Sequence, residues 1–271
     1  MTREGTPVSS PLDVLVNGVL VHRLPAAGRQ RHDVVLDPLP AGSVVELWLP
    51  QFGGFRLREA ALEGANAAAL PESGPRWVTY GSSLTQCQQA DGPSETWPAL
   101  VAARYGWELH NLGMAGECQL DPAVEETISA LSADLISLCL GINSYNAATF
   151  SERTYASRIF GFVSAVRRAH PRTPLAVITP MPSAPREDRA NAVGWTLEQY
   201  RQATEQVVGV LQKRGDARLH CIHGRDVLSP EEAQANMPDT LHPDNAGYRL
   251  MAQRLGPRLS AIYQGSFAAT V

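Results

Sequence analysis

The feature that most constrains the fold is an alternation of short apolar runs with longer amphipathic segments over residues 76–263. The apolar runs are RWVTYG (76–81), WELHNLG (107–113), DLISLCLG (134–141), LAVITP (175–180) and LHCIHG (219–224). Each run precedes a segment of helical periodicity, at 95–105, 122–132, 152–169, 196–214 and 244–263. Strand–helix alternation repeated five times predicts a five-stranded parallel sheet with helices on both faces, an α/β fold of three layers.

Residues 12–62 have a different sequence pattern. They hold short β-branched runs such as DVLVNGVLVHRL, HDVVLDPL and SVVELWLP, which Gly and Pro interrupt. The Asn17-Gly18 pair between two apolar runs is a strong β-hairpin signal. We therefore predict a small all-β unit of about five strands. Because about 60 residues are few for an independent sandwich, we expect this unit to pack against the rest of the chain.

The stretch EGANAAALPESGP (63–75) separates these two regions and is predicted to be a loop or linker. We predict a small, sandwich-like β domain over residues 1–70 and the α/β domain over residues 71–271.

Composition and charge argue against several function classes. The net charge is −4 and no run of like charges occurs, so a nucleic-acid partner is not indicated. No segment approaches the ~18 apolar residues that span a bilayer, and the N-terminus has no apolar core typical of a signal peptide. We expect a cytoplasmic protein without a membrane partner, and the oligomeric state stays open.

The four cysteines are scattered and form no CxxC pair, which favours free buried thiols over a zinc site or a disulfide framework. They are Cys87, Cys118, Cys139 and Cys221. No metal or other cofactor is expected from this pattern.

Polar residues follow the predicted strands where the carboxyl end of a parallel sheet binds ligands. The segments concerned are Gly81 to Thr85, Asn111 to Gly116, Gly141 to Ser144 and, before the last helix, Asp239 to Pro243. Their shared position at strand ends predicts that they meet in one site.

These residues suit nucleophilic catalysis. A serine hydroxyl needs a base such as histidine, and the histidine needs a carboxylate that fixes its tautomer and orientation. Asp239 and His242 are three residues apart on one loop, so the carboxylate can reach the imidazole. A backbone N–H at the start of the first helix, a close backbone approach at Gly113 and the side-chain amide of Asn143 could hold an oxyanion.

The blocks GSSLT, NLGMAG, GIN and DTLHP together resemble the four blocks of the SGNH hydrolases, also called GDSL-type esterases. The resemblance covers about residues 76–263. It implies a flavodoxin-like three-layer α/β fold and serine ester hydrolysis or acyl transfer without a metal. By this resemblance Ser83 is the nucleophile, and Asp239 and His242 are its acid and base. The oxyanion residues would be Ser83, Gly113 and Asn143.

Two positions depart from the family pattern. Ser82 stands where aspartate is commoner, and the third block reads GINS rather than GxND, although the asparagine amide is retained. Four further residues are candidates for lining the substrate site: Ser82, Cys118, Gln119 and Tyr145. The segment 181–195 follows the fourth predicted strand and is either a lid over the site or a solvated loop.

Finer features resemble a bacterial branch whose members carry an N-terminal β-sandwich-like domain, and this likeness includes VELWLPQFGGFRLREAAL. Some members of that branch are acyltransferases that modify natural products. We expect a serine esterase that acts on a small-molecule ester. The alternatives are an acyltransferase acting on a natural-product or sugar hydroxyl, and an inactive carbohydrate-binding or scaffold protein.

Overall fold

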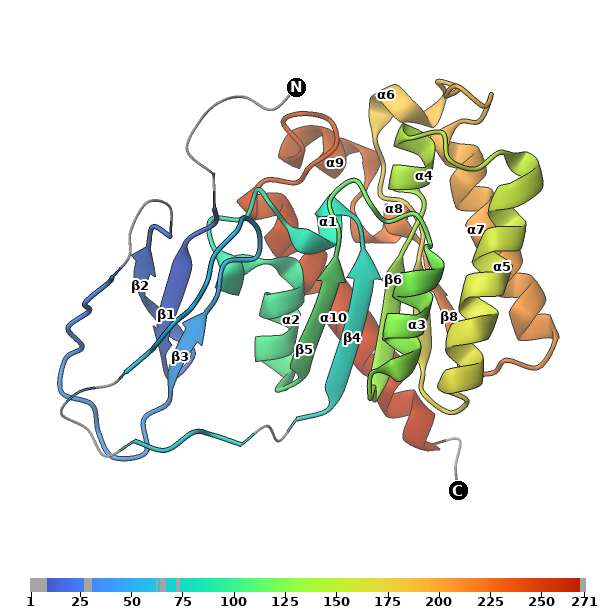
Figure 1. The fold of residues 1–271 in the computed structure, drawn as a ribbon. Helices are drawn as coiled ribbons and strands as arrows, with labels where there is room; N and C mark the ends of the chain where they lie inside the picture. Colours follow the sequence, from blue (N-terminus) through green and yellow to red (C-terminus); the bar gives the residue numbers. More distant parts are fainter. Residues whose placement is uncertain (1–8, 27–30, 62, 64–66, 72–73, 269–271) are drawn as a thin grey trace.

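The computed structural model describes residues 9–26, 31–61, 63, 67–71 and 74–268. Its main feature is a five-stranded parallel sheet of order β5-β4-β6-β7-β8 (Figure 1). The strands are β4 (Arg76–Gly81), β5 (Glu108–Gly113), β6 (Leu135–Cys139), β7 (Leu175–Ile178) and β8 (Leu219–Ile222). Each lies within one of the five predicted apolar runs. This order is the flavodoxin-like one, so the predicted fold class is confirmed.

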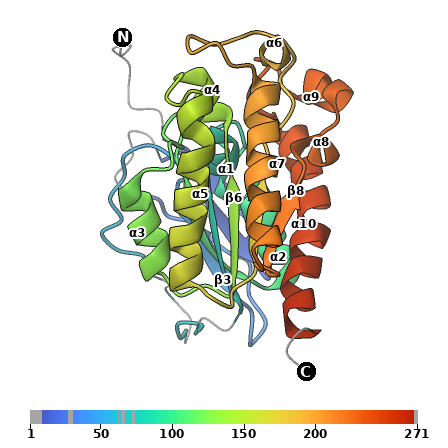
Figure 2. The same cartoon turned by 90° about the vertical axis from the view of Figure 1, so that its right-hand side faces the viewer.

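Helices cover both faces of this sheet. The pair α2 (Trp97–Tyr105) and α10 (Asn245–Ala268) packs on one face, and α3 (Pro122–Ala130), α5 (Glu152–Ala169) and α7 (Leu197–Lys213) pack on the other (Figures 1 and 2). These helices coincide closely with the five predicted helical segments. Within the described residues, no helix is both long and apolar enough to cross a membrane.

Short elements gather at the edge to which the strand arrows point (Figure 1). They are α1 (Ser83–Gln86), η1 (Pro93–Glu95), α4 (Ile142–Asn146), α6 (Ala184–Glu187), α8 (Gly224–Val227) and α9 (Pro230–Asn236). Most of the predicted site residues lie in or beside these elements. The sheet therefore brings segments that are distant in sequence to one edge.

Aromatic residues form the core between the sheet and the helix pair α2/α10. Trp77 contacts Trp97 and Trp107, with ring centroids 5.7 and 5.6 Å apart. Trp97 is fully buried, as expected for a core residue, and its indole N–H donates to the Leu84 carbonyl at 2.9 Å. This bond ties α2 to α1, so the core directly supports the short helix that follows β4.

The N-terminal region forms a separate antiparallel sheet of order β2-β1-β3, with β1 (Leu12–Val16), β2 (Val19–Leu24) and β3 (Val45–Trp48). The hairpin prediction is confirmed, since Asn17 and Gly18 both have positive φ, 50° and 76°. The prediction of about five strands was too high for the described residues. The stretch 31–40 has no strand partner there, and its Val35 side chain is 90% exposed. The predicted domain boundary near residue 70 stays a prediction.

A network of ion pairs joins the N-terminal sheet to η1 and α10 of the α/β part. Asp13 of β1 is fully buried and accepts hydrogen bonds from Arg23 Nε at 2.8 Å and from the Ser94 hydroxyl at 2.7 Å. Arg23 also contacts Glu95 at 2.8 Å, and Glu95 contacts Arg249 of α10 at 2.5 Å. Burial acts to raise the pKa of Glu95, but the hydrogen bonds from both arginines outweigh it and lower that pKa. The expected packing of the N-terminal unit against the α/β part is thus held by charged contacts.

Removing Arg23 should destabilise the protein because it leaves the Asp13 carboxylate buried without its counter-ion. We expect Arg23→Ala to lower the free energy of unfolding by about 2–3 kcal/mol, below the full range for a buried pair because Ser94 still donates. Arg31→Ala is the matched control, because its partner Asp33 is 73% exposed and such pairs contribute about 0–1 kcal/mol. Urea unfolding of the three proteins measures both values. Equal losses in the two variants would contradict a structural role for the buried pair.

Candidate functional site

The turn between β4 and α1 presents the two neighbouring serines differently. Ser82 is the N-cap of α1, fully buried, and its hydroxyl accepts a hydrogen bond from the Leu84 N–H at 3.2 Å. Ser83 is the first residue of the helix, and its N–H has no partner among the described residues. The Ser82 hydroxyl caps α1, whereas the Ser83 hydroxyl points toward the loop before α10.

The Ser83 hydroxyl lies 2.8 Å from Nε2 of His242. On the far side of the imidazole, His242 Nδ1 lies 2.6 Å from Asp239 Oδ2. A carboxylate accepts hydrogen bonds but cannot donate them, so Nδ1 carries the proton and Nε2 is free to accept from the serine. The structure therefore joins Ser83, His242 and Asp239 in a continuous hydrogen-bonded chain.

Local hydrogen bonds fix the Asp239 carboxylate. Its Oδ1 accepts from the Leu241 N–H at 2.9 Å and from the His242 N–H at 2.6 Å. Partial burial acts to raise the pKa of Asp239, but the bonds from His242 and Leu241 outweigh it and lower the pKa to about 2. Asp239 is therefore ionised at neutral pH although about half of its side chain is exposed.

Asn143 lies in α4, directly after β6, and is almost fully buried. Its Oδ1 accepts a hydrogen bond from the Cys118 N–H at 3.0 Å, which identifies the oxygen of the amide. The NH₂ group then points away from Cys118 and has no partner among the described residues. This arrangement leaves a fixed donor available to a ligand, as an oxyanion residue requires.

The predicted oxyanion role of Gly113 does not fit the geometry. The Gly113 N–H donates to Oδ1 of Asn111 at 2.8 Å, so it is not free for a ligand. The glycine is needed for packing instead, because a Cβ there would lie 2.3 Å from the Gln86 nitrogen of α1. Gly113 thus allows the end of β5 to approach α1 closely.

The turn after β5 contains another candidate donor. Most amides from 113 to 120 have acceptors: Asn111 Oδ1, Gly81 O, Gln86 Oε1, Met114 O, Asn143 Oδ1, Glu117 O and Tyr80 Oη. The exception within the described chain is Gly116, which has a φ of 78° and a Cβ direction free of neighbours. Gly116 could not be chosen from the sequence, because several acceptors that occupy the other amides come from three distant segments: the end of β4, α1 and α4.

The other lining candidates differ in position. Cys118 is 2% exposed, and its Sγ lies 3.6 Å from the Cys139 carbonyl, so this thiol faces the core rather than a substrate. Gln119 Nε2 donates to the Gly116 carbonyl at 3.2 Å and to the Asn143 carbonyl at 3.3 Å. Gln119 thereby connects the two segments that carry the unpartnered donors. The Tyr145 hydroxyl donates to the Arg189 carbonyl at 2.9 Å, so it anchors a loop.

The segment 181–195, predicted as a lid or a solvated loop, is tied to the site on one side. The Ser183 hydroxyl donates to the Thr240 carbonyl at 2.7 Å, and Arg186 donates to that carbonyl at 3.2 Å and to Asn146 at 3.0 Å. Thr240 lies between Asp239 and His242, directly after the aspartate, and has a φ of 64°. These bonds make the segment a support for the loop that carries Asp239 and His242.

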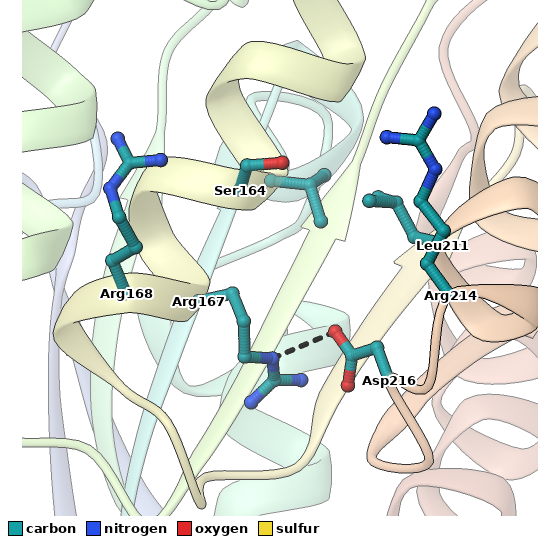
Figure 3. A pocket seen from close by; sticks show the side chains of 7 residues that line it. Ser164, Arg167, Arg168, Leu211, Arg214 and Asp216 are labelled. Carbon is teal, nitrogen blue, oxygen red and sulfur yellow. Dashed lines mark hydrogen bonds and ion pairs between the residues drawn. The ribbon is translucent and has the colours of Figure 1, made fainter.

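A separate hollow lies between α5 and α7, away from these residues (Figure 3). Arg167 pairs there with Asp216 at 2.8 Å and donates to the carbonyls of His170 and Thr173. Because these carbonyls follow the end of α5, the Arg167 side chain caps the C-terminus of this helix. None of the predicted catalytic residues lines this hollow.

A strand-end serine–histidine–aspartate chain on this α/β sheet defines a hydrolase or acyl-transfer type of enzyme. Residues 75–260 match the GDSL-like lipase/acylhydrolase family, so the chain belongs to that family, and the resemblance seen in the sequence is confirmed. No match was found among curated proteins.

Solved structures agree with this assignment. A salicylyl-acyltransferase from a tetracycline biosynthetic pathway shares 32% identity, over 96% of this chain and 75% of that chain, with a TM-score of 0.83. A GDSL-like lipase from Bacteroides ovatus is 22% identical over 95% of this chain and 76% of its own, with a TM-score of 0.77. A family two carbohydrate esterase from Clostridium thermocellum is 15% identical over 96% and 88%, with a TM-score of 0.68. The last two show the fold alone.

The depressed pKa of Asp239 gives a test of the hydrogen-bonded chain. Because the folded pKa of about 2 lies below the unfolded value of about 3.9, ionised Asp239 stabilises the fold above pH ~4. This contribution is lost as the pH falls toward 2. We expect Asp239→Asn to lower Tm at pH 6 and the difference from wild type to shrink on acidification. A Tm difference that is constant from pH 6 to pH 2.5 would contradict the assigned contacts.

Proposed function

We propose that the protein hydrolyses a carboxylic ester of a small molecule through an acyl-enzyme on Ser83. The observation that carries this proposal is the hydrogen-bonded chain from Ser83 through His242 to Asp239. The family assignment supports acyl chemistry in general, and the residues at the strand ends supply the specific roles.

In this mechanism Ser83 Oγ attacks the ester carbonyl carbon while its proton passes to His242 Nε2. The tetrahedral intermediate collapses, the bond to the alkoxide oxygen breaks, and His242 returns the proton to the leaving alcohol. A water molecule, deprotonated by His242, then attacks the acyl-enzyme; the bond between the acyl carbon and Ser83 Oγ breaks, His242 returns the proton to Oγ, and the acid leaves. Asp239 keeps the imidazole in the productive tautomer and stabilises the imidazolium.

Three donors would hold the oxyanion of each tetrahedral intermediate. They are the N–H groups of Ser83 and Gly116 and the side-chain NH₂ of Asn143. Their availability supports this role, since each lacks a protein acceptor among the described residues. Gly116 thus replaces Gly113 in the set expected from the sequence.

Acyl transfer is the second candidate, and a specific observation favours it. The 32%-identical structural relative, similar over nearly the whole of this chain, is an acyltransferase. Transfer uses the same acyl-enzyme and differs only in that an acceptor alcohol takes the place of water. The intact catalytic chain argues against an inactive carbohydrate-binding protein.

Ser83→Ala should abolish turnover of p-nitrophenyl esters, with kcat lower by roughly 10⁴–10⁶-fold, as expected for loss of a triad nucleophile. Ser82→Ala is the matched control: it removes a helix cap, so stability falls by about 1 kcal/mol while kcat stays within about tenfold. Ser83 should also be the residue labelled by a fluorophosphonate. Equal losses of activity in both variants would refute the assignment of the nucleophile.

Two substitutions at Asn143 separate its possible roles. Asn143→Ala removes the donor and should lower kcat by about 10²–10³-fold with little change in KM. Asn143→Asp retains an oxygen for the Cys118 N–H but places negative charge beside the oxyanion, so kcat should fall at least as far. If Asn143→Asp retains activity, the residue only supports the Cys118 backbone.

Competition between water and an acceptor decides between the two acyl-enzyme fates. Wild-type protein is supplied with an activated ester and increasing concentrations of a polyhydroxylated acceptor, and released acid and new ester are quantified. Hydrolysis predicts acid as the main product at every acceptor concentration. If ester formation outcompetes acid release, the protein is an acyltransferase.

A further inference from the structure

The side chain of Gln86, the last residue of α1, connects three parts of the molecule. Its Oε1 accepts a hydrogen bond from the Ala115 N–H at 3.2 Å, directly before Gly116. Its Nε2 donates to the Gln51 carbonyl at 3.2 Å, in the segment that follows β3. The Gln86 side chain therefore links three parts: α1, the turn that carries the free Gly116 amide, and the N-terminal region.

The N-terminal region makes a second contact with α1, from the side chain of Gln51. Gln51 Nε2 donates to the Cys87 carbonyl at 3.3 Å, and Cys87 is the C-cap of α1 with a φ of 60°. Gln51 is itself fixed, because its N–H donates to the Ser10 hydroxyl at 2.9 Å. Gln86 thus donates to the Gln51 carbonyl and Gln51 donates to the Cys87 carbonyl, so α1 is held at its C-terminal end from outside the parallel sheet.

The conformation of Gly116 depends on contacts made by its neighbours. It has a left-handed φ, and its N–H has no acceptor among the residues that the structure describes. Its position is set by neighbouring bonds: Met114 N–H to Gly81 O at 2.8 Å, Gln119 to its carbonyl, and Ala115 N–H to Gln86. An oxyanion donor must be held in place before the reaction to be effective.

We propose that Gln86 is a positioning residue for the oxyanion site and that, through Gln51, the N-terminal region holds this site in its reactive geometry. The proposal rests on the proposed acyl-enzyme function. Gln86 touches neither the substrate nor the reacting atoms. It acts by keeping the Gly116 amide aligned with the amide of Ser83, which lies on the same helix as Gln86.

Gln86→Met tests this role, because methionine has a similar length but cannot make either hydrogen bond. The control is Gln89→Met, since Gln89 is exposed and its side chain has no hydrogen-bond partner among the described residues. We measure kcat and KM for a p-nitrophenyl ester and the inhibition constant of a boronic acid, which forms a tetrahedral adduct on a reactive serine. Thermal unfolding is followed in parallel.

The expected result is a kcat lower on the order of tenfold in Gln86→Met, less than the loss of an oxyanion donor itself. The boronate inhibition constant should rise by a similar factor while KM changes little. A merely structural role would lower Tm without this parallel shift. Unchanged kcat and boronate inhibition in folded Gln86→Met would overturn the proposal.

Gln51→Ala provides a second variant that leaves Gln86 intact and removes the bond to the Cys87 carbonyl. It should lower kcat in the same direction and by a smaller factor. The double variant should lower kcat further than Gln86→Met alone, because the two side chains make separate hydrogen bonds to the same region. Wild-type kcat in Gln51→Ala would overturn the part assigned to the Gln51 side chain.

The failure of the proposed function itself would look different. If wild-type protein neither turns over esters nor reacts with a fluorophosphonate at Ser83, the acyl-enzyme mechanism is wrong. If wild-type protein reacts and Gln86→Met behaves identically, only the positioning role is wrong.

Discussion

The parallel register of β4 with its two neighbours is the constraint on which the site depends. β4 pairs with β5 so that Gly81 lies opposite Gly113, and with β6 so that Tyr80 lies opposite Leu138. Three chain segments therefore leave the sheet at the same height, next to the point where strand order reverses. Ser83, Gly116 and Asn143 come from these three segments, and the loop before α10 adds His242 from 159 residues away.

Hydrogen-bond saturation then determines which polar groups near the site remain free to bind a ligand. The backbone amides around the site bind carbonyls and side chains wherever an acceptor is within reach, as buried polar groups must. Among the described residues, the donors left without a protein acceptor include the N–H groups of Ser83 and Gly116 and the side-chain NH₂ of Asn143. The same bonds that stabilise the turns therefore decide where negative charge can be held, so stability and the proposed catalysis share one network.

The sequence was sufficient for features set by local periodicity and by residue type. The strands and helices of the α/β part, the Asn17-Gly18 hairpin and the Ser83–His242–Asp239 grouping follow from patterns within a few residues or from strand-end position. The choice between Gly113 and Gly116 does not, because it depends on acceptors such as Asn111 Oδ1, Gln86 Oε1 and Tyr80 Oη. Stretch 31–40 shows the opposite failure: an alternating apolar pattern without a neighbouring strand to complete it.

The exposure of Asp239 shows how the loop that carries the proposed catalytic acid can be fixed without deep burial. About half of this side chain is open to solvent, so burial does not account for the orientation of Asp239 toward His242. Orientation comes instead from the bonds that its carboxylate accepts within the loop. The Thr240 carbonyl is held in turn by Ser183 and Arg186 of the segment after β7. The loop conformation, including the positive φ of Thr240, is thus stabilised from a second segment, and His242 needs no buried acid to face Ser83.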